Sequence, residues 1–154
     1  MINTPDQSVS ILGYIDRKRY LWMLSTLWPA TPMIGLWLVA QTGWSIWYAL
    51  VLIVWYAMVP LLDAMFGEDF NNPPEEAVEM LEKDRYYRVL TYLTVPIHYA
   101  ALIVAAWWVS THAMSWLEII TLALSLGIVN GLALNTGHEL GHKKETFDRW
   151  LAKL

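Results

Sequence analysis

Four long stretches of the chain consist almost entirely of apolar residues. Residues 20–40, 44–62 and 89–109 contain no Asp, Glu, Lys or Arg, and residues 116–135 contain only Glu118, near their beginning. Each stretch is about 20 residues long, which is enough for a helix to cross the hydrocarbon core of a bilayer. Because the bilayer offers no water to backbone groups, such runs are expected to be helical. The pattern predicts an all-α, polytopic transmembrane helical bundle with four spans, forming a single membrane domain.

Three of the four predicted spans contain proline. Pro29 and Pro32 lie in the first span, Pro60 in the second and Pro96 in the third. Proline has no N–H to donate and clashes with the preceding turn, so we expect kinks or local breaks at these positions. The first span is too long for the apolar part of a cleavable signal peptide, so we expect it to remain in the mature chain.

The composition supports a membrane protein and excludes several other classes. Of the 154 residues, 56% are hydrophobic and only 16% are charged. The 10 Trp and 8 Tyr residues are typical of chains that meet lipid headgroups. A net charge of −4 without a basic tract argues against nucleic acid as a partner. The absence of cysteine excludes disulfides and thiolate metal ligands.

All ten Lys and Arg residues lie on one side of the predicted spans. They occur before the first span, between the second and third, and after the fourth, whereas the turns at 41–43 and 110–115 contain none. The positive-inside rule therefore predicts that both ends of the chain are cytoplasmic. The loop 63–88 and the segment 136–154 would then share the cytoplasmic side, where we expect the functional site.

The cytoplasmic loop contains a helix start. Asn72 is a good cap, Pro73 suits the first helical position, and acidic residues follow. We therefore expect a helix from about Pro73 towards the third span. Its acidic side chains form either a docking face for a soluble partner or an ordinary solvated face.

Two histidines lie four residues apart just after the fourth span. On a helix His138 and His142 share a face, so their imidazoles can bind one transition-metal ion at the cytoplasmic edge of the bilayer. Two ligands do not complete a site, and a pair of interfacial histidines is the structural alternative. The same residues spell H-E-x-x-H, in which Glu139 would be the general base of a zinc metalloprotease.

A stripe of small residues leads from the histidines into the fourth span. Gly127 and Gly131 form G-x-x-x-G, followed on the same face by Leu134 and Asn135. This pattern favours close helix packing, a narrow apolar groove that ends at a metal, or both. His98, inside the third span, is either a hydrogen-bonded core residue or a metal ligand.

The segment Asn135–Lys143 resembles the first histidine box of membrane-bound alkane 1-monooxygenases. The resemblance extends to residues 24–32, 67–76 and 86–88, and so covers nearly the whole chain. It implies a membrane enzyme with two non-haem iron ions held by histidines from several boxes. Such an enzyme uses O₂ to hydroxylate the terminal methyl group of a medium-chain n-alkane, giving a 1-alkanol.

The resemblance also implies partners and a location. Electrons would come from rubredoxin, which an NADH-dependent rubredoxin reductase reduces. The enzyme would be a multi-pass protein of the bacterial inner membrane, surrounded by lipid, with its active site towards the cytoplasm.

Individual residues take roles from the same resemblance. His138 and His142 match first-box iron ligands, and Glu139 becomes a neighbour of the site. Trp55 matches the position at which side-chain bulk limits alkane length, and Leu132 is a second candidate for the pocket. The groove interpretation adds three more candidate substrate-binding residues, Gly131, Leu134 and Asn135.

Members of this family are longer than this chain and have further histidine boxes. We therefore expect these residues to be the N-terminal portion of a longer catalytic domain, and an isolated chain of this length to be inactive. A histidine-box fatty-acid desaturase or hydroxylase is the alternative within the same chemistry. The metalloprotease and a partner-binding membrane segment are alternatives of other classes.

Overall fold

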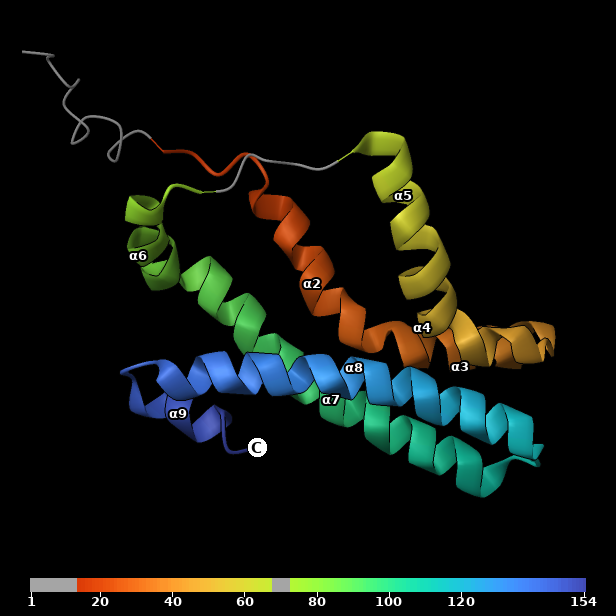
Figure 1. Ribbon diagram of the computed structural model, residues 1–154. Helices are drawn as coiled ribbons and strands as arrows, with labels where there is room; N and C mark the ends of the chain where they lie inside the picture. Colours follow the sequence, from red (N-terminus) through yellow and green to blue (C-terminus); the bar gives the residue numbers. More distant parts are fainter. Residues whose placement is uncertain (1–13, 68–72) are drawn as a thin grey trace, which may run out of the picture.

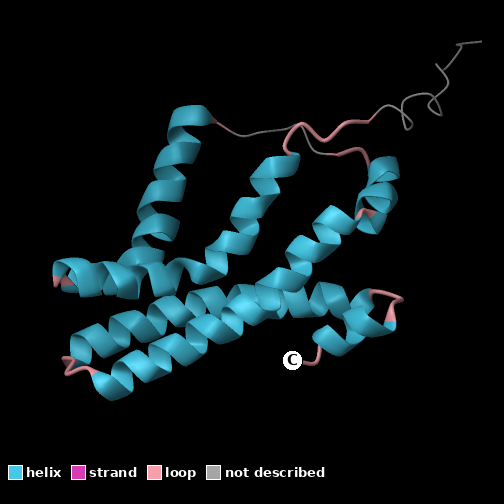
Figure 2. Ribbon diagram, turned by 180° about the vertical axis from the view of Figure 1, so that it is seen from behind, coloured by secondary structure: helices cyan, strands magenta, loops and turns pink. Residues whose placement is uncertain are grey.

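The computed structural model describes residues 14–67 and 73–154, and the regular structure in these residues is entirely helical (Figures 1 and 2). Four helical segments are long and apolar enough to cross a membrane, namely Arg19–Thr42, Ser45–Phe66, Arg85–Thr111 and Trp116–His142. The all-α class with four apolar spans is thus confirmed. Each helical segment extends beyond its predicted stretch at one end or both, because backbone hydrogen bonding continues past the first charged side chains.

The first span is interrupted near its prolines, as predicted. It comprises the 3₁₀ turn η1 (Arg19–Trp22), α2 (Met23–Leu27), the 3₁₀ turn η2 (Trp28–Ala30) and α3 (Thr31–Thr42). Pro29 lies in η2 and Pro32 at the start of α3, and the chain changes direction between α2 and α3 (Figure 1). Gly43 ends α3 in the left-handed region, with φ of 69°.

The second span is also divided. It comprises η3 (Ser45–Ala49), α4 (Leu50–Ile53), the π-helical turn η4 (Val54–Met58) and α5 (Val59–Phe66). The wide turn directly precedes Pro60, whose missing N–H disrupts the regular helical ladder. Beyond it, α5 stands apart from the other long helices, and most of its residues are exposed (Figure 1).

The two longest helices, α7 (Arg85–Thr111) and α8 (Trp116–His142), pack against each other (Figure 1). Of the kink or local break expected at Pro96, the break does not occur, since α7 is one continuous helix across this residue. At the start of α8, Ser115 and Glu118 form a capping box. The Glu118 carboxylate also accepts a hydrogen bond from Ser45, which joins this end of α8 to η3.

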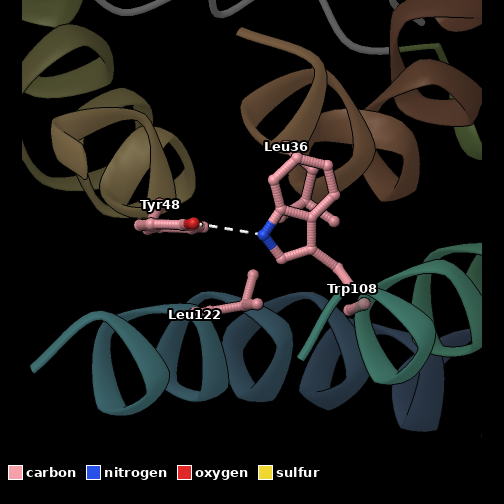
Figure 3. Packing of buried hydrophobic residues seen from close by; sticks show 5 residues of the cluster. Leu36, Tyr48, Trp108 and Leu122 are labelled. Carbon is pink, nitrogen blue, oxygen red and sulfur yellow. Dashed lines mark hydrogen bonds between the residues drawn. The ribbon is translucent and has the colours of Figure 1, made fainter. Parts of the chain in front are cut away.

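A small core lies where α3, η3, α7 and α8 meet. Leu36, Tyr48, Trp108 and Leu122 are buried there, and the Trp108 indole donates a hydrogen bond of 3.1 Å to the Tyr48 hydroxyl (Figure 3). His112 is exposed and stacks on Trp108, with ring centroids 3.8 Å apart.

The predicted loop 63–88 is shorter than expected, because α5 continues to Phe66 and α7 begins at Arg85. Its helix, α6 (Glu75–Lys83), begins two residues after the predicted start, with Pro74 in extended conformation before it. The predicted cap, Asn72, lies outside the described residues.

Asp84 joins α6 to α7 and fixes the entry into the third span. Its carboxylate accepts hydrogen bonds from the backbone N–H of Tyr86, at 2.8 Å, and from the Arg19 guanidinium, at 2.6 Å. The hydrogen bond from Arg19 holds the pKa of the Asp84 carboxyl below its usual value. The ion pair that ties the first span to the third therefore persists at neutral pH.

Candidate metal centre and adjoining cavity

The histidine pair lies on the last turn of α8, which remains helical through His142. As predicted, His138 and His142 face the same way, with their Nε2 atoms 3.1 Å apart and their ring centroids 4.5 Å apart. Both side chains are exposed. The two imidazole nitrogens therefore lie within hydrogen-bonding distance of each other.

This spacing fits two ligands of one metal ion. Nitrogens bound at about 2.1 Å, with an angle between 90° and 109° at the ion, lie about 3.0–3.4 Å apart. The 3.1 Å separation of the two Nε2 atoms falls in this interval. Among the described residues, however, no group of three or more His, Cys, Asp or Glu side chains could hold a metal. The pair is thus a partial site.

Two acidic residues near the motif do not complete a metal site with the histidine pair. Glu139 is exposed and forms no metal-binding group with the histidines within the described part of the chain. Asp148, one of the few acids that follow the motif, is 4% exposed and bound elsewhere. The third ligand that either a zinc protease or an iron site needs is therefore not supplied by these two carboxylates.

A cavity of about 780 Å³ adjoins the histidine pair. It lies between α7, α8 and the short helix α9 (Thr146–Leu151), which folds back beside the end of α8 (Figure 1). Its wall on α8 follows one helical face that includes Asn130, Leu134, Gly137, His138 and His142. Most of the wall is apolar, so the cavity suits an apolar ligand with one end at the imidazoles.

Only one of the four predicted substrate-binding residues on α8 lines this cavity. Leu134 lines this cavity, whereas Gly131, Leu132 and Asn135 are not among its lining residues. At Gly131 an added Cβ would meet no heavy atom of the described residues within 4 Å, so the predicted close packing is not seen there. The stripe is therefore an open face of α8 in this part of the protein.

Trp55 lies away from the cavity, in the π-helical turn η4. Its ring packs against Trp28 of the first span, with centroids 5.0 Å apart. Trp55 is 39% exposed, and the indole N–H of Trp28 is buried without a partner among the described residues. The two indoles thus join the points at which the first and second spans deviate from a regular α-helix.

The sequence reasoning missed the attachment of α9. Asp148 accepts a hydrogen bond from Tyr92 and lies 3.9 Å from the Arg88 guanidinium, and Arg88 in turn donates to Tyr92 at 2.9 Å. Ala152 lies beside Gly137 and Gly141. A Cβ added at either glycine would be 3.8 Å from an atom of Ala152. The sequence did contain one signal for this attachment. Arg88 and Tyr92 stand four residues apart on one helix and put a basic group at the membrane edge, which favours a carboxylate partner.

His98 is a buried polar residue of α7, with 8% of its surface exposed. It interacts with the side chain of Asn130 on α8, and both residues line the cavity. It does not join other ligands in a metal-binding cluster of the described residues. Of the two interpretations from sequence, the structure favours the hydrogen-bonded core residue.

Comparison with known proteins identifies the family. No protein-family model matches the chain. It is 80% identical to alkane 1-monooxygenase of Ectopseudomonas oleovorans, 78% to that of Pseudomonas putida and 76% to alkane 1-monooxygenase 1 of Alcanivorax borkumensis. Each alignment covers 92% of this chain but 35% of the relative, so the chain spans about a third of the length of these proteins. At this identity over nearly all of its residues, the chain belongs to the alkane 1-monooxygenase family.

Proposed function

We propose that this chain provides the first histidine box of a membrane-bound, non-haem di-iron monooxygenase that converts medium-chain n-alkanes to 1-alkanols. The observation that carries the proposal is the 76–80% identity to proteins named alkane 1-monooxygenase. The paired imidazoles at one end of a mostly apolar cavity support it.

His138 and His142 would hold iron through their Nε2 atoms, and the other ligands would come from outside the described residues. Imidazole-bound iron supplies the redox chemistry by which O₂ attacks a strong C–H bond. The residues of this chain position the substrate. Leu134 and its neighbours on α8 would hold an alkane along the cavity wall with its terminal methyl group at the imidazoles.

The proposed electron donor is rubredoxin, reduced by its NADH-dependent reductase. It would dock on the cytoplasmic side of the bacterial inner membrane, where the positive-inside rule predicts that both chain ends lie.

This function is tested on a full-length protein that carries this sequence. Purified protein is expected to contain iron, and to convert n-octane to 1-octanol with O₂ and reduced rubredoxin. A fatty-acid product or a new double bond would favour a related histidine-box enzyme. Zinc with peptide hydrolysis would favour the metalloprotease. The absence of both metal and product would contradict an enzyme of any of these classes.

The topology is tested with a reporter inserted in the turn at residues 110–115. We expect a periplasmic signal, because this turn lacks Lys and Arg while the opposite side holds all ten. An alkaline phosphatase fusion, active only outside the cytoplasm, measures this, and a fusion after Lys144 serves as the cytoplasmic control. An inactive fusion in the turn would reverse the proposed orientation.

Replacing Trp55 with Ser is expected to shift the preferred alkane to a longer chain. This expectation rests on the family resemblance at this position, because Trp55 does not line the cavity beside His138. The change removes an indole that packs on Trp28 and opens space next to it. Gas chromatography of products from an equimolar mixture of n-alkanes measures the shift. The matched control is Trp37→Ser, which changes an exposed tryptophan in the first span. Identical profiles for the Trp55 variant and the parent would show that Trp55 does not limit alkane length.

A further inference from the structure

The cavity wall contains a pair of polar side chains within the spans. His98 of α7 and Asn130 of α8 interact across the helix interface, and both line the cavity. His98 is 8% exposed, and its Nδ1 atom is buried without a hydrogen-bond partner in the described part of the chain. An incompletely paired polar group in an apolar interior is costly and calls for an explanation.

The threonines of the wall do not share this property. Thr94 donates its hydroxyl to the Thr91 carbonyl at 2.7 Å, and Thr136 donates to the Leu132 carbonyl at 3.5 Å. The side-chain amide of Asn130 has two N–H groups and a carbonyl oxygen, so its contact with His98 leaves further hydrogen-bonding capacity. At this depth of the cavity, Asn130 is thus the side chain best able to bind a polar group.

The position of the pair defines the length and charge of a ligand. Asn130 precedes His138 by eight residues, which is about 12 Å along the axis of α8. Ala133, Leu134 and Gly137 line the intervening wall. The charged lining residues, Arg149 and Lys153, lie on or just after α9 rather than beside Asn130 in the spans. Because a buried carboxylate needs a cationic partner, an uncharged hydroxyl suits the pair better.

We propose that Asn130, held by His98, binds the hydroxyl group of a medium-chain 1-alkanol whose apolar chain lies along α8 towards His138. A hydroxyl both donates and accepts, which matches the free donors and acceptor of the amide. The inference rests on the proposed function, because a 1-alkanol is the product of that reaction. It implies that the alcohol rebinds head first in the alkane cavity and competes with the alkane.

The test measures binding and needs neither O₂ nor electrons. Full-length protein in lipid nanodiscs is labelled with an alkyl diazirine that has no polar head, and labelled peptides of α7 and α8 are quantified by mass spectrometry. Competition with 1-octanol and with n-octane gives the concentration of each that halves the labelling. Comparing variants in the same lipid removes the effect of partitioning.

Asn130→Leu is expected to raise the required 1-octanol concentration about tenfold, as for the loss of one buried hydrogen bond, and to change that of n-octane by less than about twofold. His98→Leu should act in the same direction, and His98→Gln should restore much of the alcohol affinity, because an amide can still hold Asn130. Thr94→Val is the matched control, since its hydroxyl is already bound to the Thr91 carbonyl.

Each outcome decides the inference. Unchanged competition by 1-octanol in Asn130→Leu would overturn it, and so would an equal loss for 1-octanol and n-octane, which indicates a structural role for the pair. If the parent protein binds n-octane no less tightly than 1-octanol and the variant does not alter this, only this inference fails. If n-octane does not compete in the parent, the proposed function fails as well.

Discussion

Replacing His138 with Ala in a full-length enzyme that carries this sequence is expected to remove bound iron and alkane hydroxylation together. The two Nε2 atoms, 3.1 Å apart, are positioned as a pair, and a single remaining imidazole cannot chelate. We expect the rate of 1-octanol formation to fall by more than about 100-fold, beyond the loss caused by removing a partner that only orients a ligand. Elemental analysis and gas chromatography on the same preparation measure both effects.

Glu139→Gln is the control for this experiment. Glu139 is exposed on the same helical turn and does not belong to a metal-binding group of the described residues, so iron and rate should both remain. Full iron content and full rate in the His138 variant would contradict its assignment as a ligand. Loss of a zinc-dependent hydrolysis in the Glu139 variant would instead indicate the metalloprotease.

Replacing Gly35 with Ala is expected to destabilise this chain by about 1–3 kcal/mol, the usual cost of overpacking. An added Cβ would lie 2.5 Å from the backbone oxygen of Trp47, and a backbone atom cannot move aside without shifting η3. The core around Leu36, the next residue of α3, would shift with it. The midpoint of thermal unfolding in detergent, followed by circular dichroism, measures the loss.

Gly127→Ala is the matched control for this prediction. An added Cβ there meets no heavy atom of the described residues within 4 Å, and alanine favours a helix by about 0.5–1 kcal/mol over glycine. Its unfolding midpoint should stay level or rise. Equal midpoints for the Gly35 variant and the parent would show that η3 adjusts freely, against the packing described above.

Hydropathy and histidine spacing predicted much of this architecture. The apolar runs identified all four spans because a bilayer imposes a length on every helix that crosses it, and this constraint acts locally along the chain. The pairing of His138 with His142 was equally predictable, because it depends only on a spacing of four residues along one helix.

The contacts between distant segments were not predictable in the same way. Pro60 indicated a disturbance in the second span, but its form, a π-helical turn that carries Trp55, depends on how the first span packs beside it. Pro96 indicated a kink or a local break, and α7 runs through it without a break. Whether proline interrupts a helix depends on the partners available to the freed carbonyl, and sequence spacing does not contain that information.

The attachment of α9 shows the same limit. Asp148 is separated by 56 residues from Tyr92, to which it is bound, so periodicity could not connect them. The burial of Asp148 excludes it from a metal site near His138 and assigns it to holding a wall of the cavity.

The continuity of α8 has a mechanical consequence. A helix of 27 residues is about 40 Å long and behaves as a lever, fixed at its N-terminal end by the capping box and by the hydrogen bond from Ser45 to Glu118. Helices longer than the local hydrocarbon thickness respond to a thinner bilayer by tilting. The position of the imidazoles relative to the headgroups is therefore coupled to membrane thickness, so lipid acyl-chain length becomes a variable that sets how far the histidine pair stands from the bilayer surface.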